Sequence, residues 1–159
     1  MAPVNVRMTL NALNKTRLLY IGALQGISHE QAQQFTDGPD GWNILTIMCH
    51  LKDYQKIYLE RLDMILGSDN PIFRSYDRFD LIEANNYAGQ NIQTVLAEYS
   101  QTRDAFLAVL GEVGDEQWSR TGKFADDSEL PALGVLMMLL AHDNDHLEQV
   151  TRVLREAGR

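Results

Sequence analysis

Apolar residues recur at helical spacing in four long runs of the chain. The runs cover about residues 6–24, 43–66, 91–113 and 128–157. Within each run, apolar side chains follow one another at intervals of three and four residues, as they do on one face of an amphipathic α-helix. Helices of about 20 residues are about 30 Å long, which is enough for four of them to pack side by side. The pattern therefore predicts an all-α fold, a four-helix bundle with few or no strands.

The segments between these runs carry capping and turn signals. Ser28 and Gln31 have the spacing of a capping box, which predicts a short helix after the first run. Asn43 is a candidate N-cap for the second long helix, and Ser128 is one for the last helix. Residues 72–90 show no clean period and predict a long connection with one helical segment near residues 81–87. A connection of this length lets the chain cross over along the bundle instead of forming a plain hairpin.

Length and composition are those of one globular domain spanning residues 1–159. The formal net charge of −8 argues against nucleic acid or an anionic membrane as a partner, because both are negatively charged and bind basic surfaces more strongly. The single cysteine, Cys49, excludes an intrachain disulfide and is expected to be a small buried apolar residue. The sequence has no run of roughly 18 apolar residues that would span a membrane and no apolar core of a signal peptide near Met1. We therefore expect a cytoplasmic protein.

Three of the four histidines lie in apolar helical runs. His142 and His146 are four residues apart in the last run, so their rings share one helix face, and His50 lies in the second run. If these two helices pack together, the three imidazoles converge, and three neutral imidazoles with an open position are typical of a catalytic metal site. The alternative is that they are ordinary core or boundary residues with hydrogen-bond partners. His29 is expected to be an exposed residue in the first turn of the short helix and not a ligand.

Several polar residues flank these histidines at helical spacing. Asp53 lies one turn after His50, where it could orient a ligand or touch a substrate, or else be a solvated or ion-paired side chain. Gln149 follows His146 on the same stripe and could hydrogen-bond a ligand. Asp53 and Gln149 are therefore the candidate residues that support catalysis. Asp143 and Asp145 add negative charge beside the histidines, and Asp145 is the better placed of the two to touch a ligand.

The order of these motifs resembles the DinB/YfiT superfamily. The resemblance covers about residues 10–155 and rests on Trp42-Asn43-Ile44, His50-Leu51-Lys52-Asp53, Arg61, Phe79-Asp80, Asn85, Arg103, Trp118 and the segment from His142 to Val150. It implies an up-down-down-up four-helix bundle with a long crossover connection. It also implies one divalent metal ion held by His50, His142 and His146. Imidazole ligands suit Zn, Ni or Fe, and the ligand set does not choose among these metals.

The resemblance implies three classes of function. The first is a metal-dependent S-transferase or detoxification enzyme that uses a low-molecular-weight thiol, such as bacillithiol or mycothiol. The second is a metal-dependent hydrolase, and the third is a non-catalytic metal-binding or stress-response protein. The expected partners are a small-molecule thiol or electrophile, with no nucleic acid and no membrane. The resemblance also suggests a homodimer, for which Met137 and Met138 are candidate contacts unless they belong to the core.

Overall fold

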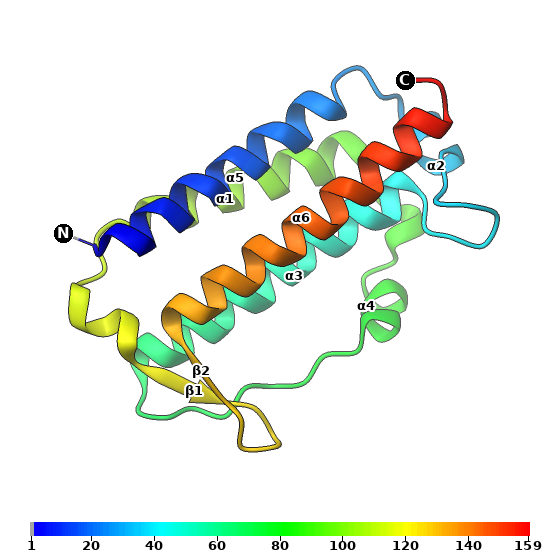
Figure 1. The fold of residues 1–159 in the computed structure, drawn as a ribbon. Helices are drawn as coiled ribbons and strands as arrows, with labels where there is room; N and C mark the ends of the chain where they lie inside the picture. Colours follow the sequence, from blue (N-terminus) through cyan, green and yellow to red (C-terminus); the bar gives the residue numbers. More distant parts are fainter. Residues whose placement is uncertain (1) are drawn as a thin grey trace.

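The structure of the chain is a computed structural model that describes residues 2–159. Four long helices form its body (Figure 1): α1 (Val4–Ala23), α3 (Ile44–Gly67), α5 (Ile92–Leu110) and α6 (Ala132–Glu156). The shorter elements are α2 (His29–Gln34), α4 (Arg78–Ala84), the 3₁₀ helices η1 (Tyr87–Gly89) and η2 (Asp115–Ser119), and the strands β1 (Thr121–Lys123) and β2 (Glu129–Pro131). The predicted all-α four-helix bundle is confirmed.

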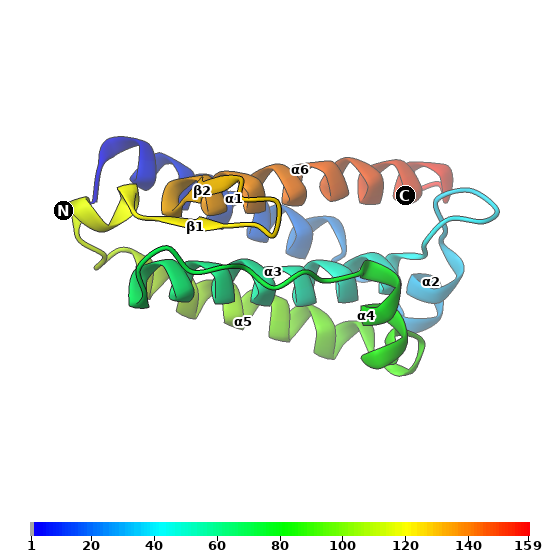
Figure 2. The same cartoon turned by 90° about the horizontal axis from the view of Figure 1, so that it is seen from below.

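The bundle has the up-down-down-up order. In Figure 1, α1 and α6 run in one direction, and α3 and α5 run in the other. Figure 2 shows α1 and α6 as one layer lying over α3 and α5. Because α3 and α5 are parallel, residues 68–91 must return along the whole bundle, and this crossover contains α4 and η1. The predicted long crossover connection is therefore confirmed.

The helix ends follow the capping signals at some positions and depart from them at others. Asn43 caps α3 by accepting a hydrogen bond from the Thr46 amide at 2.8 Å, and Ser28 forms the predicted capping box with Gln31. The Ser128 cap was wrong, because α6 begins at Ala132, after Pro131. Ser128 instead lies in the turn of a hairpin in which β1 and β2 pair antiparallel, within a segment expected to be a polar loop.

The hairpin holds the start of the crossover against the bundle. The Phe73 amide donates to the Lys123 carbonyl at 2.7 Å, and the Lys123 amide donates to the Pro71 carbonyl at 2.8 Å. Gly122 is required at this contact, since a Cβ atom there would lie 2.4 Å from the Phe73 ring. Strand β1 therefore fixes the direction in which the crossover leaves α3.

The buried core consists of two apolar clusters, one toward each end of the bundle. The first includes Tyr20, Leu51, Tyr99 and Val150, and the second includes Leu13, Phe106 and Leu139. Between them, all four long helices contribute to one buried polar network, through Thr16 from α1, Gln55 from α3, Arg103 from α5 and Asp143 from α6. A polar layer thus crosses the middle of the bundle.

The polar layer is centred on a buried ion pair. Arg103 and Asp143 have fully buried side chains, and the guanidinium donates to both carboxylate oxygens, at 2.8 and 3.3 Å. Arg103 also donates to the Gln55 side chain at 2.5 Å, and the Thr16 hydroxyl donates to Asp143 at 2.9 Å. The Tyr20 hydroxyl donates to the Asp143 carbonyl at 2.6 Å. All four helices are therefore joined at one level by directional bonds.

Two surface features bear on possible partners. Met137 and Met138 on α6 are 58% and 37% exposed, so they do not belong to the core. Within residues 2–159, no helix combines the length and the apolarity that crossing a bilayer requires. The homodimer is not tested by these features and stays a prediction.

We predict that Arg103→Met destabilises the fold by about 3–5 kcal/mol, because it leaves Asp143 as an uncompensated buried charge. The matched control is Asp104→Asn, whose side chain is 70% exposed and pairs with Arg17 at the surface. This control should change the free energy of unfolding by less than about 1 kcal/mol. Urea denaturation of both variants checks the prediction, and equal effects of the two would contradict it.

Candidate metal centre

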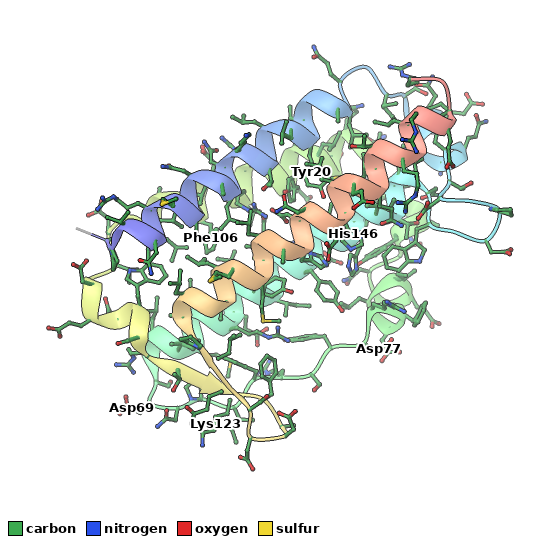
Figure 3. The ribbon with its side chains drawn as sticks, in the orientation of Figure 1. Tyr20, Asp69, Asp77, Phe106, Lys123 and His146 are labelled. Atoms are coloured by element: carbon green, nitrogen blue, oxygen red, sulfur yellow. The ribbon has the colours of Figure 1, made fainter. Side chains whose placement is uncertain are left out.

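Three histidine side chains from two adjacent helices meet at one point. His50 comes from α3, and His142 and His146 come from successive turns of α6. One ring nitrogen of each lies within 4.8 Å of the others, and the Nε2 atoms of His50 and His142 are 2.9 Å apart. Figure 3 shows His146 at the same end of the bundle as Asp77, the N-cap of α4. The predicted convergence of the three imidazoles is confirmed.

Aromatic side chains hold the three rings in place. The Trp42 ring stacks on His146 at a centroid distance of 6.3 Å and an interplanar angle of 11°, and it lies 4.9 Å from His50. The Tyr54 ring stacks on His142 at 5.1 Å and 17°, and it lies 4.2 Å from His50. Each imidazole is therefore oriented by packing, which limits its rotation away from the meeting point.

Burial keeps two of the imidazoles uncharged. Burial first, and then the neighbouring histidines, lower the pKa of His50 and of His142 to about 3. Both effects disfavour the charged ring, because it is desolvated and a second positive charge nearby is unfavourable. At neutral pH both rings are neutral and can offer a lone pair, which is the form that binds metal.

The proton on His146 is placed by a chain of hydrogen bonds. The Gln149 amide donates to Asp37 at 2.8 Å, so its Oε1 atom is the acceptor that faces His146 Nδ1 at 2.7 Å. Arg152 donates twice to Asp37, at 3.0 Å each, and with Gln149 it holds the pKa of that carboxyl below its usual range. His146 therefore carries its proton on Nδ1, which leaves the Nε2 lone pair free. Orienting bonds of this kind are common around metal ligands.

The donor set fits a divalent metal ion. The Nδ1 atoms of His50 and His142 are buried and have no hydrogen-bond partner among the described residues. Their Nε2 atoms face each other at 2.9 Å, and one ring nitrogen of each of the three histidines lies within 4.8 Å of the others, so one ion could contact all three. Three imidazole nitrogen donors with space beside them match the ligand set of a catalytic site for Zn or a similar metal.

A pocket of about 560 Å³ opens beside the three rings. The aromatic rings of Trp42, Tyr54 and Phe79 line it, together with Asp37, Asp40, Gly41, Arg78, Gln149 and the three histidines. Arg78 and Phe79 belong to α4, so the crossover supplies one wall, and residues 37–42 supply another. The pocket is large enough for a small molecule to reach the histidines.

The other predicted site residues fall in different places. Gln149 contacts His146, as proposed from its spacing, whereas Asp53 lies outside this pocket and accepts a hydrogen bond from Asn85 at 2.7 Å. Neither Asp143 nor Asp145 lines the histidine pocket, and the preference for Asp145 as the residue that touches a ligand stays a prediction. Asp145 is exposed, and Asp143 is fully buried in the ion pair with Arg103, because it continues the buried face of α6.

The remaining histidine and the cysteine lie apart from this group. His29 begins α2 and is half-buried instead of exposed, and it is not part of the histidine group. Cys49 is fully buried, and burial raises the pKa of its thiol to about 12. The thiol is therefore protonated at neutral pH, which agrees with the prediction of a small buried residue.

Sequence reasoning missed the residues that orient the histidine rings, both by direct stacking and through intervening hydrogen bonds. Asp37 and Arg152 join the loop before α3 to α6, although 115 positions separate them. Trp42 and Tyr54 lie near His50 in the sequence, and this proximity is the one signal that could have suggested their role. Their spacing does not indicate that they stack on the histidine rings.

Comparison with known proteins identifies the family and the fold. The DinB superfamily profile matches residues 12–150, while no curated protein matches the chain. YfiT from Bacillus subtilis, a probable metal-dependent hydrolase with an unusual four-helix bundle topology, superposes with a TM-score of 0.89 at 18% identity, over 99% of this chain and 90% of YfiT. The mycothiol-dependent maleylpyruvate isomerase superposes with a TM-score of 0.70 at 18% identity, over 91% of this chain and 60% of the isomerase.

At this level of identity the two structures show the shared fold alone, and the chain spans only 60% of the isomerase's length. The profile match is independent of them and covers most of the chain. It shows that this chain belongs to the DinB superfamily.

Proposed function

We propose that the chain binds one divalent metal ion through His50, His142 and His146 and catalyses a metal-dependent thiol transfer. The observation that carries the proposal is the convergence of three imidazoles, from α3 and α6, beside a pocket of about 560 Å³. A three-histidine set without a fourth protein ligand leaves a position for a small molecule. The metal is Zn, Ni or Fe, since these suit imidazole ligands.

The side chains around the histidines have distinct tasks in this proposal. When bound, the metal would supply Lewis acidity that lowers the pKa of a thiol or a water molecule at its open position. Gln149 keeps the His146 proton on Nδ1, so that Nε2 remains a donor. Trp42 and Tyr54 fix the rings and exclude water from one side of them. The remaining space in the pocket accommodates the thiol and an electrophile.

The comparisons supply support for two chemistries. The structural neighbour that isomerises maleylpyruvate depends on mycothiol, which supports a low-molecular-weight thiol as the partner here. YfiT is a probable metal-dependent hydrolase, which supports the second candidate, hydrolysis by an activated water. A metal-binding protein without catalysis is the third alternative. Thiol transfer is preferred because the pocket walls are aromatic and can hold an organic thiol beside the histidines.

The proposal extends to partners and location. The chain carries 14 basic and 22 acidic residues, and this balance disfavours binding to nucleic acid or to an anionic membrane. We propose a small-molecule thiol or electrophile as the partner, a cytoplasmic location and a homodimer.

The first prediction from this proposal concerns the metal ligands. The purified protein should contain about one divalent ion per chain, and His50→Ala, His142→Ala and His146→Ala should each lose it, because each removes one of three donors. His29→Ala is the matched control and should keep the metal. Elemental analysis measures the content, and full occupancy after removal of both His142 and His146 would rule out this ligand set.

The second prediction separates the candidate functions. Adding a thiol to the cobalt-substituted protein should change its visible absorption spectrum, and the loaded protein should consume thiol in the presence of an electrophile. A hydrolase would instead cleave esters or amides with no thiol present, and a binding protein would do neither. A loaded protein with no spectral response and no thiol consumption would contradict the transferase proposal.

The third prediction concerns pH. In the metal-free protein, His50 and His142 have pKa values of about 3, against 6.5 for an unperturbed histidine. Between about pH 6.5 and 3 the unfolded chain binds more protons at these positions than the folded chain, so the free energy of unfolding should fall as the pH falls. Urea denaturation across this range should show a shallower fall in the His50→Gln/His142→Gln variant, and equal slopes would contradict the prediction.

A further inference from the structure

Helix α4 is attached to the bundle by few contacts. It has seven residues, all of which the structure describes, and none of them is buried. Hollows lie on two sides of it: Arg78 and Phe79 line the histidine pocket, and Leu81 lines a second pocket of about 420 Å³. Figure 1 shows α4 standing beside α3, outside the four long helices. Because α4 packs so little against the bundle, other interactions must hold it in position as a wall of the histidine pocket.

Polar contacts at the end of α4 supply that attachment. Asn85, the C-cap of α4, donates from its side chain to the Asp53 carboxylate on α3 at 2.7 Å. The Asn85 carbonyl accepts from Gln90 at 2.8 Å, and Gln90 in turn accepts from Lys52 at 2.6 Å. Asp53 is only 8% exposed. A hydrogen bond to a charged and nearly buried acceptor is stronger than one between neutral groups.

Next to these contacts, η1 places the buried side chain of Tyr87 in the core. Tyr87 is 1% exposed and packs in the apolar cluster at this end of the bundle, and Ile82 of α4 packs against the same cluster. Burial, and then the negative charge of Asp53, raise the pKa of Tyr87, which places this hydroxyl in the field of the same carboxylate. Asp53 therefore lies where the crossover is tied to α3.

We propose that Asp53 is a positioning residue that holds α4, through Asn85, as the outer wall of the histidine pocket. Asp53 follows His50 by one turn, but its carboxylate faces the second pocket and bonds to Asn85, whereas the histidine rings face the first pocket. Asp53 thus acts on the size and shape of the thiol site and not on the metal ligands. The part of this inference that concerns thiols rests on the proposed function, and the part that concerns α4 does not.

Hydrogen exchange tests the attachment of α4 without any ligand. Asp53→Ala and Asn85→Ala should each raise amide exchange in Arg78–Ala84 by about tenfold, and the double variant should add little, because both remove the same bond. Asp53→Asn keeps an acceptor for Asn85 but removes its charge, so it should raise exchange by less than Asp53→Ala does. The matched control is Asp63→Ala, which changes an exposed residue of the same helix. Unchanged exchange in α4 in both single variants would overturn the proposal.

Metal affinity separates this role from that of a residue that orients a ligand. Asp53→Ala should bind cobalt as tightly as the unmodified protein, within about twofold. Gln149→Ala should lose about 10–100-fold, as is usual when a partner of a metal ligand is removed. A comparable loss in Asp53→Ala would show that Asp53 acts on the histidines, and it would overturn the positioning role.

Two thiols of different size test the effect on the pocket. In the cobalt-substituted protein, Asp53→Ala should weaken glutathione binding by about tenfold and leave 2-mercaptoethanol binding unchanged, because only the larger thiol reaches the α4 wall. Equal losses for both thiols, or none for glutathione, would count against the positioning role. If neither thiol changes the spectrum of the unmodified protein, the proposed thiol function fails, and the hydrogen-exchange comparison still decides whether Asp53 anchors α4.

Discussion

The buried ion pair between Arg103 and Asp143 is the interaction on which the rest of the structure depends. Apolar faces alone allow helices to slide along one another by a turn with little change in burial, whereas a fully buried charge pair has one satisfactory arrangement. Because α1 and α3 also bond to this pair through Thr16 and Gln55, the four helices share one register. On α6, Asp143 directly follows His142 and lies three residues before His146. The register of α6 against α3 therefore also sets whether His142 meets His50.

The histidine site combines a rigid side with a lightly held side. The imidazoles sit on α3 and α6, two packed helices of the bundle, and stacking by Trp42 and Tyr54 further restrains them. The opposite walls are the loop before α3, held by Asp37 and Arg152, and α4, held by Asn85. Precision is needed where a metal is held, and adaptability is useful where small molecules enter. In this arrangement the histidines lie on the rigid side, and the lightly held α4 lies on the side where a small molecule would enter.

Much of the fold and the three histidines could be predicted from the sequence, because helical periodicity is a local property. The hairpin could not, since strands of three residues have no measurable period and depend on packing against Phe73. The burial of Asp143 could have been predicted from the sequence, because it lies four residues after Leu139 and seven before Val150, which are both buried on the core face of α6. Its partner Arg103 was not predictable, because nothing local indicates which distant residue will neutralise a buried charge.

The ligand set does not determine the chemistry of such a site. A metal held by three imidazoles could activate either a thiol or a water molecule, so the two chemistries would differ in what the pocket holds beside it. Here that space is bounded by Trp42, Tyr54 and Phe79, rings that favour an organic molecule over bulk water. Two of these rings are fixed by contact with the histidines, and the third, Phe79, is 59% exposed on α4. Because α4 has no buried residue, this part of the crossover can change in sequence without disturbing the register of the bundle. It is therefore the part of the pocket wall in which selection among small molecules is physically least constrained.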